Sequence, residues 1–364
     1  MHYLNPSHKS AHVLIFYRNF MKGPNKCSHV GLGVMGIHTA RVLRRVPIRA
    51  DLFGIQDAYP TKEYPESIST ILEKNPTCTH ALVEAPFVSA LDMSKLMFQF
   101  PNVSFVCRCH SQIGFLQVEA GAINLIRDYL LLQEGNLNFH FAANSTRLCD
   151  WVQETYNSAS LYLPNLYDFE RCETKNVFTP FDHRMLRVAS FGALRLLKNH
   201  TTAAAAAQII ARSRNCDLEF YLSVNREEHG KGVLQSIRNM YKNLRWAKLV
   251  EVEWESWPQF RRTVAHMDLC LQISFTETFN ITTADAVAEL VPSVVTNCIE
   301  WLPDNCKADA DDAKDVARVG NMLLQNPRAV NDNYRYLSKY VRQGTQRWVD
   351  FLDGKSGSHN HTDW

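Results

Sequence analysis

The fold of this chain is decided by one stretch, Ser274-Phe-Thr-Glu-Thr-Phe-Asn-Ile-Thr-Thr-Ala-Asp-Ala-Val-Ala-Glu-Leu-Val-Pro-Ser-Val-Val-Thr-Asn297. It follows an apolar run, Leu269-Cys-Leu-Gln-Ile273, that predicts a buried strand, and a second strand is expected at residues 293–296. Between the two strands we expect a turn that carries Glu277 and a short helix that carries Asp285. A turn that opens a helix after a strand presents backbone N–H groups to a ligand phosphate. The two carboxylates on either side of it can accept hydrogen bonds from hydroxyl groups.

Length and composition indicate a globular protein of two domains. The 364 residues exceed a single typical core, and 46% hydrophobic with 21% charged residues is the balance of a folded enzyme. The net charge of +2 selects neither nucleic acid nor membrane as a partner. The N-terminus has no apolar segment and the chain has ten cysteines, which favours a cytoplasmic protein with reduced thiols and no membrane insertion.

Apolar runs of strand length alternate with helical segments along both halves of the chain. The runs occupy residues 12–17, 50–55, 80–84, 103–108, 139–143 and 160–163, and then 186–191, 218–224, 247–252 and 269–273. Such alternation predicts the α/β class, with parallel sheets covered by helices on both faces.

The same pattern indicates where the chain divides. We expect an N-terminal Rossmann-like domain over residues 1–168 and a C-terminal Rossmann-like domain over 169–340, joined by an irregular linker at about 164–181. Residues 341–364 are expected to end a long helix that crosses back to the first domain and to close in a disordered tail.

A second loop, Ser190-Phe-Gly-Ala-Leu-Arg-Leu-Leu-Lys-Asn-His200, opens the second domain before an alanine-rich helix. Gly192 allows a ligand to approach the backbone closely. Arg195 and Lys198 stand beside a helix N-terminus, where two cations neutralise a diphosphate. The loop therefore predicts a phosphate site, and the alternative is a surface loop with two solvated bases.

Together the two stretches resemble the C-terminal domain of retaining GT-B glycosyltransferases of the family-4 type. That family has Glu-x-Phe-Gly, a second Glu eight positions after the first, and then Gly-x-Pro before a Val-rich strand. Its earlier loop has Gly-Arg-Leu, three residues, and Lys followed by Gly or Asn. The matching residues here are Glu277, Phe279, Pro292, Gly192, Lys198 and Asn199.

The chain departs from the family pattern at four positions. Asn280 and Leu290 replace two glycines, Asp285 replaces the second Glu, and Ala193 replaces the Arg of the earlier loop. We expect Arg195 to supply the charge that is missing at Ala193. These departures leave open a GT-B-like binding module without catalytic activity.

The resemblance implies a GT-B fold, with two Rossmann-like domains facing each other across a cleft, and transfer of a sugar from a nucleotide sugar. The leading donor is a UDP-sugar, and the family retains anomeric configuration without a metal or other cofactor. The catalytic residues that it implies are His110, Glu277, Lys198 and Arg195. The implied donor-binding residues are Gly31, Gly33, Gly192, Asn199, Asn280, Ile281, Thr282 and Asp285.

Particular roles follow from the resemblance. Glu277 would hold hydroxyl groups of the donor sugar, and Asp285 would accept a hydrogen bond from the ribose. Lys198, Arg195 and the amides of Ile281 and Thr282 would stabilise the leaving diphosphate. His110 follows the predicted strand at 103–108, where related enzymes carry a His beside the donor sugar. A structural role for a His at a strand end is the alternative.

The segment Gly31-Leu-Gly-Val-Met-Gly36 matches G-x-G-x-x-G, the pattern of dinucleotide-binding proteins. We expect a glycine-rich loop here that approaches the donor phosphate and the acceptor, followed by a helix to Arg45. The first strong strand ends well before the motif, and the acids Asp51 and Asp57 do not clearly end a second strand. An NAD-dependent oxidoreductase that uses residues 31–36 is the alternative function.

Two further motifs receive ordinary structural explanations. The Cys107-Arg-Cys109 pair has no second cysteine pair at zinc spacing, so we expect strand residues rather than metal ligands. Asp309-Ala-Asp311 lies in an acidic run where a helix begins, and acids favour the first turn of a helix.

The acceptor is the least determined part of the function. The chain also resembles virus-encoded GT-B proteins, some of which glycosylate hydroxymethylated bases in DNA, and a viral member would act in the host cytoplasm. A basic patch that would suit a phosphate backbone is formed by Arg41, Arg44, Arg45 and Arg49. The leading acceptor is therefore a 5-hydroxymethylated pyrimidine in DNA, and a glycan, lipid or small molecule is the alternative.

Overall fold

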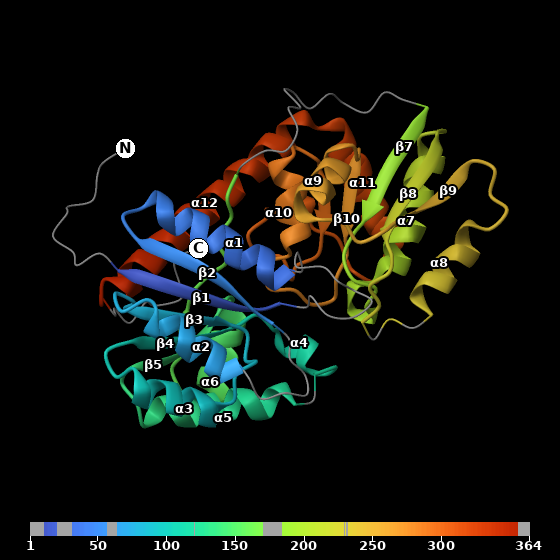
Figure 1. Cartoon of the computed structure of the whole chain (residues 1–364). Coiled ribbons are helices and arrows are strands. Elements are labelled where there is room, and N and C mark those ends of the chain that lie inside the picture. The colour runs from blue at the N-terminus through green and yellow to red at the C-terminus, as the bar shows by residue number, and fades with distance from the viewer. Residues whose placement is uncertain are drawn as a thin grey trace. The chain divides into compact units, whose positions relative to one another are not determined.

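The computed structural model describes residues 11–19, 31–56, 64–119, 121–169, 184–228, 230 and 232–355, with only the backbone at 56, 64, 65 and 327. The chain divides into two compact units, one formed by Met1–Asp168 with Val341–Trp364 and the other by Phe169–Tyr340 (Figure 1). The predicted disordered tail at 356–364, most of the predicted linker and Asp57 lie outside the described residues.

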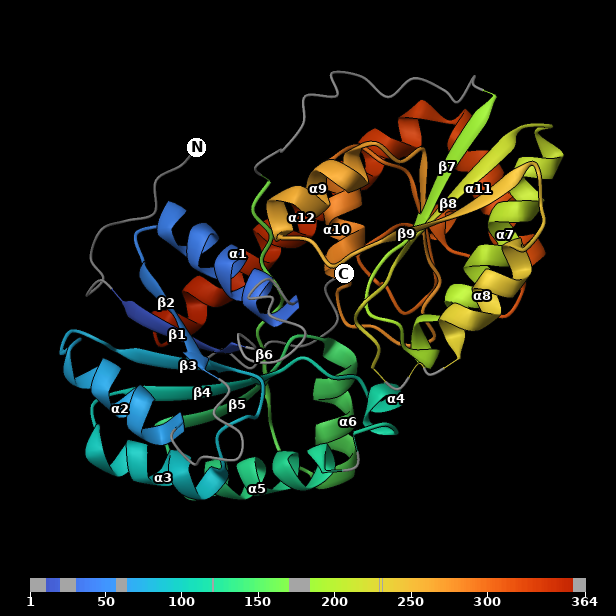
Figure 2. The same ribbon diagram turned by 45° about the vertical axis from the view of Figure 1, so that its right-hand side comes forward.

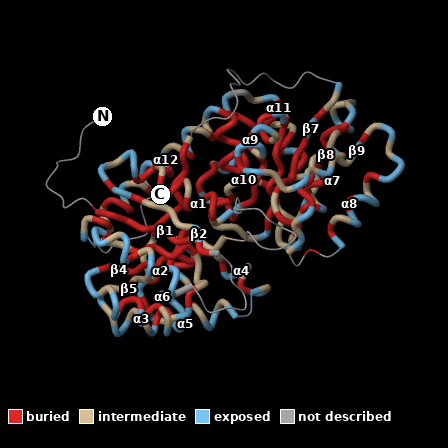
Figure 3. The backbone as a smooth tube through the Cα atoms, viewed as in Figure 1, coloured by how far each residue is buried: buried red, intermediate tan, exposed pale blue. Residues whose placement is uncertain are grey.

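The first unit contains a six-stranded sheet in the order β2-β1-β3-β4-β5-β6, and all neighbouring strands are parallel. Its strands are β1 (His12–Asn19), β2 (Arg49–Gln56), β3 (His80–Glu84), β4 (Ser104–Cys109), β5 (Phe139–Ala143) and β6 (Leu161–Tyr162). Each of the six predicted apolar runs forms a strand, because a strand that is buried on both faces is apolar throughout. Figure 3 shows that the central strands are buried.

Helices cover both faces of this sheet (Figure 2). They are α1 (Gly31–Arg45), α2 (Tyr64–Glu73), α3 (Ala90–Gln99), α4 (Ile113–Leu116), α5 (Ala122–Glu134) and α6 (Thr146–Tyr156). Leu14 and Phe16 of β1 face a core that includes α2, α3, α5 and α6, whereas Val13 and Ile15 face α1. Successive strand residues point to opposite faces, so one apolar run supplies both cores. The prediction of a sheet covered on both faces is confirmed for this unit.

The glycine-rich motif is not a loop, which corrects the sequence prediction. Helix α1 begins at Gly31, so all six residues from 31 to 36 are helical. The helix packs on β1 and β2, and a Cβ atom at Gly36 would lie only 2.8 Å from Leu52 Cδ1. The last glycine of the motif therefore allows close packing of the helix on the sheet, a role that sequence spacing alone does not distinguish from ligand binding.

The second unit contains a five-stranded parallel sheet in the order β11-β10-β7-β8-β9. Its strands are β7 (Met185–Ser190), β8 (Asp217–Ser223), β9 (Ala247–Val252), β10 (Leu269–Gln272) and β11 (Ser293–Val295). Its helical segments are η1 (Leu196–Lys198), α7 (His200–Ser213), α8 (Val233–Tyr241), α9 (Trp257–Ala265), α10 (Ile281–Ala288), η2 (Asp304–Cys306) and α11 (Ala313–Gln325). Because all strands are parallel, the loops that follow them lie at one edge of the sheet, where α/β proteins bind ligands.

The final helix, α12 (Pro327–Leu352), contributes to both units. Its first part belongs to the second unit, where Tyr340 stacks on Phe279 with ring centroids 5.4 Å apart. Its last part belongs to the first unit, where Trp348 is buried and its Nε1 donates to Pro164 O at 2.9 Å. Among the helices of the described residues, none is long and apolar enough to span a membrane.

Candidate functional site

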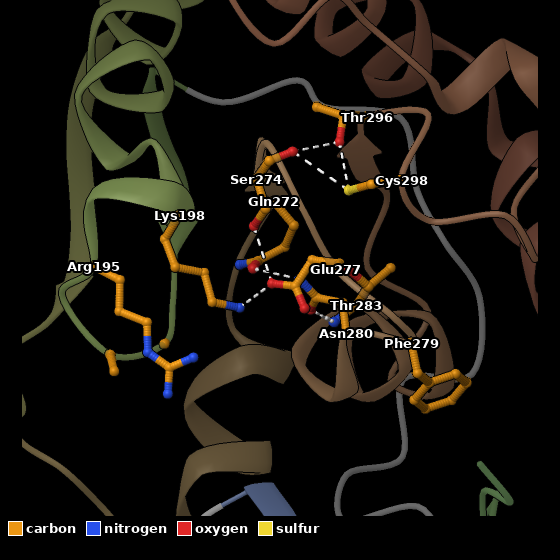
Figure 4. Close-up of polar contacts among 12 residues, drawn as sticks. Arg195, Lys198, Gln272, Ser274, Glu277, Phe279, Asn280, Thr283, Thr296 and Cys298 are labelled. Carbon is orange, nitrogen blue, oxygen red and sulfur yellow. Dashed lines mark hydrogen bonds and ion pairs between the residues drawn. The ribbon is translucent and has the colours of Figure 1, made fainter. Parts of the chain in front are cut away.

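Lys198 and Glu277 form an ion pair at the carboxyl edge of the second sheet (Figure 4). Lys198 lies in the loop after β7, and Glu277 lies in the loop after β10, the strand that pairs with β7. Lys198 Nζ contacts Glu277 Oε1, and Ser274 Oγ donates to the same oxygen at 3.1 Å. Both charged side chains keep some exposure, 17% for the lysine and 14% for the glutamate. The pair therefore remains accessible to a ligand.

The backbone of the β7 loop brings Lys198 to this position. Gly192 has φ +119°, which side-chain-bearing residues rarely adopt, and a Cβ there would lie 3.7 Å from Lys198 Cε. Asn199 ends the 3-10 turn with φ +55° and opens α7, and its Nδ2 donates to Ala310 O at 2.7 Å. Gly192 and Asn199 thus shape the loop from which the lysine projects.

Asn280 opens α10 beside Glu277. Its φ of +57° lies in the left-handed region, and its side-chain Oδ1 accepts a hydrogen bond from Thr283 N at 3.0 Å. The amides of Ile281 and Thr282 belong to the first turn of α10, whose N–H groups have no acceptor within a helix. The predicted phosphate-binding amides are therefore at a helix N-terminus, and their contact with a donor stays a prediction.

Two departures from the glycosyltransferase pattern now have a physical explanation. Asn280 and Leu290 stand where the family has glycine, and both have positive φ, +57° and +60°. Asparagine tolerates this conformation better than most residues, whereas for leucine it costs on the order of 1–2 kcal/mol. Both residues thus hold the left-handed backbone conformation that glycine adopts most readily.

Asp285 lies in a buried network rather than at an open surface. Trp257 Nε1 donates to Asp285 Oδ1 at 3.1 Å, and Arg261 Nε lies 3.8 Å from the same oxygen. Arg261 also pairs with Glu289, and all three charged side chains are at most 1% exposed. The carboxylate therefore ties α10 to α9 in this structure, and its predicted contact with a ribose stays a prediction.

Arg195 does not pair with the Lys198–Glu277 site. Its guanidinium contacts Glu228, which follows β8, and Arg226 Nε donates to the other oxygen of that carboxylate at 2.5 Å. Figure 4 draws Arg195 on the same segment as Lys198, with no contact between it and Glu277. The sequence did not indicate Glu228 or Arg226 as site residues.

His110 follows β4 at the carboxyl edge of the first sheet and is held by two neighbours. Its Nε2 lies 2.6 Å from Glu84 Oε2, and its Nδ1 lies 3.2 Å from Asn144 Nδ2. A carboxylate oxygen only accepts, so Nε2 carries the proton and Nδ1 accepts from the Asn144 amide. Arg108 also donates to both oxygens of Glu84, at 2.9 Å from Nε and 2.5 Å from Nη2.

Burial sets the protonation of this network. Burial alone would raise the pKa of Glu84, but the Arg108 charge and the hydrogen bonds from Arg108 and His110 outweigh it and lower the pKa to about 2. Burial also lowers the pKa of His110, and it outweighs the opposing effect of the Glu84 carboxylate. At neutral pH the imidazole is therefore uncharged and both of its nitrogens are engaged within the first unit. A catalytic role for His110 stays a prediction.

Glu84 was missed by the sequence interpretation, although a signal was present. It is the last residue of a run that was correctly predicted as a strand, and it is the one acid in that otherwise uncharged run. A polar residue that ends a buried parallel strand lies at the ligand-binding edge of the sheet. The neighbouring strand β4 ends next to His110, so strand adjacency would have joined the two residues.

The predicted basic patch is partly neutralised by two carboxylates, which weakens the case for a DNA-binding surface. The contacts are those of Arg41 and Arg45 with Asp168 and of Arg44 and Arg49 with Asp51. Asp168 is buried and Asp51 is partly exposed, so the arginines act in part as counter-ions that hold α1 and β2 in the first unit. Spacing in the sequence does not reveal these acidic partners.

Metal binding finds no support among the described residues, where no three His, Cys, Asp or Glu side chains gather in a metal-binding arrangement. Cys107 and Cys109 are buried in β4, as predicted. Asp309 and Asp311 lie in the turn before α11, where Asp311 N donates to Asp309 Oδ1 at 2.9 Å. The acidic run lies where a helix begins, as predicted, because Asp312 is the N-cap of α11 and Asp315 is in its first turn.

No protein-family model matches the chain, and no curated protein matches its sequence. Solved structures do match its fold. A glycosyltransferase from Rickettsia africae is 11% identical, with a TM-score of 0.62, over 97% of this chain and 100% of the other. Sucrose-phosphate synthase from Thermosynechococcus elongatus is 12% identical, with a TM-score of 0.66, over 94% and 100%.

An α,α-trehalose-phosphate synthase (UDP-forming) from Burkholderia xenovorans, solved with glucose-6-phosphate, is 12% identical with a TM-score of 0.64 over 94% and 100% of the two chains. At these identities the similarity establishes the fold. The chain therefore has the α/β fold of GT-B glycosyltransferases, with one parallel sheet in each unit.

Proposed function

We propose that this chain is a glycosyltransferase that moves a sugar from a nucleotide sugar, with a UDP-sugar as the leading donor, to a hydroxyl group of an acceptor. The observation that carries the proposal is the contact between Lys198 and Glu277, two residues 79 positions apart that were selected from the sequence for complementary roles. They meet at the carboxyl edge of a parallel sheet, next to the N-terminus of α10.

The chemistry of the pair suits the reaction. When the bond between the sugar C1 and the diphosphate oxygen breaks, negative charge grows on the diphosphate, and a fixed cation such as Lys198 stabilises it. Glu277 accepts hydrogen bonds from sugar hydroxyl groups and orients the sugar. In the retaining mechanism that we propose, the acceptor oxygen bonds to C1 on the face that the diphosphate leaves, and the departing phosphate oxygen takes the acceptor proton. No metal is assigned a step.

For the acceptor we propose a carbohydrate hydroxyl, including that of a sugar phosphate, ahead of hydroxymethylated DNA. Two of the solved proteins with this fold are named as synthases of sugar phosphates. The arginines that suggested DNA pair with Asp168 and Asp51. A DNA acceptor remains a proposal of lower rank, to be tested beside the carbohydrates.

The experiment incubates the chain with UDP-, GDP- and ADP-sugars, each with glucose, glucose 6-phosphate or hydroxymethylated DNA. Released nucleotide and the mass of the product are measured. We expect transfer from a UDP-sugar, and a loss of about 10²–10³-fold in kcat for Lys198→Ala, the scale for removing one group that stabilises developing negative charge. Glu277→Gln should lower kcat while leaving the circular dichroism spectrum unchanged.

Lys307→Ala is the matched control for the lysine substitution. Lys307 lies in the same unit, is 16% exposed and pairs with the exposed carboxylate of Asp304 at 2.8 Å, so it matches Lys198 in burial and in having a carboxylate partner. This variant should transfer sugar at the wild-type rate. Failure of the wild-type chain to use any sugar nucleotide would overturn the proposed function, and so would equal activity of Lys198→Ala and the control.

A further inference from the structure

Two arginines from neighbouring loops converge on one carboxylate beside the Lys198–Glu277 pair. We infer that Arg195 and Arg226 form a binding site for a phosphate group of a substrate, and that Glu228 occupies this site until the phosphate displaces it. This inference rests on the proposed function, because it assigns a phosphate of the same reaction to named residues. The phosphate belongs either to the diphosphate of the donor or to a phosphorylated acceptor.

The position of the three residues follows from the sheet. Arg195 is in the loop after β7, and Arg226 and Glu228 are in the loop after β8, which pairs with β7. Glu277 comes after β10 on the other side of β7. The strand order β10-β7-β8 therefore places the carboxylate Glu277, the cation Lys198 and the two arginines in succession along one edge of the sheet.

The two loops are fixed to each other by their backbones. Leu194 N donates to Arg226 O at 2.9 Å, and Glu228 N donates to Leu194 O at 2.9 Å. These bonds form a short parallel bridge between Leu194 and Glu227. Arg226 is further restrained, since its guanidinium lies 4.8 Å from the centre of the Trp254 ring. The spacing of the two guanidinium groups is thus built into the fold before any ligand binds.

The charge of the cluster favours an anion. Glu228 gives one oxygen to Arg195 and the other to Arg226, so one negative charge faces two positive charges. Burial alone would raise the pKa of Glu228, but the two arginines outweigh it and keep the carboxyl ionised. The side chains of Arg195, Arg226 and Glu228 are 28%, 19% and 26% exposed, so a solute can reach them.

A phosphate group is the ligand that this geometry suits. Guanidinium groups bind phosphate through paired hydrogen bonds, and a phosphate offers more charge and more acceptor oxygens than a carboxylate. In the absence of ligand, the Glu228 carboxylate accepts the hydrogen bonds of the two arginines. Its charge therefore competes directly with the ligand for the same donors.

The test is a substitution that removes this competition. Glu228→Gln keeps the shape of the side chain and removes its charge, so we expect affinity for a phosphate-bearing ligand to rise on the order of tenfold. Isothermal titration calorimetry would measure binding of pyrophosphate, UDP and glucose 6-phosphate to the full chain, with uridine and glucose as counterparts that lack phosphate. Adding Arg195→Gln to the Glu228→Gln variant should remove the gain.

Glu251→Gln is the matched control, because Glu251 receives two hydrogen bonds from Arg238 at 2.6 and 2.7 Å in the same unit. It changes net charge equally but should leave the three affinities unchanged. Tighter UDP binding in Glu228→Gln assigns the site to the donor diphosphate, and tighter glucose 6-phosphate binding assigns it to the acceptor.

The inference is overturned if no phosphate-bearing ligand binds more tightly to Glu228→Gln, if the gain equals that of Glu251→Gln, or if uridine or glucose gains as much. Its failure is separable from failure of the proposed function. A chain that transfers sugar but shows no gain keeps the function and loses the inference. If the Glu228→Gln variant binds pyrophosphate more tightly but the chain transfers no sugar, the phosphate site is kept and the proposed function is lost.

Discussion

The two sheets each carry a glutamate that pairs with a cation at the carboxyl edge, but the two pairs differ in burial. In the first unit, Glu84 and Arg108 are fully buried, and Arg108 also donates to the carbonyls of Leu163 and Pro164. In the second unit, Lys198 and Glu277 retain 17% and 14% exposure. The first pair can change partners only if the fold opens, whereas the second can exchange its partner for a ligand.

This difference in burial indicates a structural role for the first pair and a binding role for the second. The Glu84 network joins β3, β4, the segment after β6 and α12, since Arg108 lies 5.0 Å from the centre of the Trp348 ring. The strained Ala85, with φ +80°, directly follows Glu84 and shows that the surrounding structure holds this turn firmly. The Lys198 pair has fewer constraints on its side chains and faces a helix N-terminus, which are the properties of a binding site.

The largest effect should come from breaking the buried pair. Glu84→Ala leaves the Arg108 charge buried without its carboxylate, and such a change costs about 3–5 kcal/mol of folding free energy. Glu277→Ala, at the more exposed pair, should cost no more than about 1 kcal/mol. Urea denaturation of both variants measures the two losses. Equal losses would show that burial does not distinguish the two pairs.

The next effect is a dependence of stability on pH that involves both units. Burial lowers the pKa of His200 in the second unit and of His80 in the first to about 4. Each histidine stays neutral in the folded chain while the unfolded chain takes up a proton near pH 6.5. The stability that each contributes is therefore present above pH 6.5 and is lost as pH falls to about 4, by about 3 kcal/mol per residue.

Glu84 should affect the stability of the fold in a lower, separate pH range. Its folded pKa of about 2 lies below the usual value of 4.5, so its contribution is present above pH 4.5 and is lost as pH falls toward 2.

The contribution of the histidines is checked by unfolding free energies measured between pH 7 and 4 on wild type and His200→Gln. The variant should show a shallower decline, and an unchanged slope would contradict the assignment.

The smallest effect concerns the turn beside Glu277. Asn280→Ala removes the hydrogen bond that Thr283 N donates to the side chain, and it leaves alanine at φ +57°, a conformation that asparagine tolerates better. The two effects together should lower the free energy of unfolding by about 1–2 kcal/mol. Asn280→Gly restores the residue of the glycosyltransferase pattern and should lower the free energy of unfolding by only about a few tenths of a kcal/mol. Thermal unfolding of the two variants measures the difference. A glycine variant as unstable as the alanine variant would remove the conformational explanation.

Much of the architecture could be predicted because it depends on local patterns. The runs at residues 80–84 and 139–143 coincide with β3 and β5, since β strands buried on both faces leave an apolar segment that no turn residue interrupts. The run at 247–252 coincides with β9, an edge strand. The meeting of Lys198 and Glu277 could also be predicted, because loops that follow paired parallel strands lie side by side. The helical start at Gly31 could not, because the packing of Gly36 on Leu52 depends on a strand 16 residues away.

The sequence by itself determined the fold class, the strand and helix order and the two loops that carry Lys198 and Glu277, because periodicity and glycine placement act over short distances. Only the tertiary structure decided the partners of His110, Arg195, Asp285 and the arginines of the predicted basic patch. Apart from Arg49, which pairs with Asp51 in the same strand, each of these groups meets its partner from another part of the chain, where several charged residues could have served. Burial and proximity select among them, and neither is a property of sequence spacing.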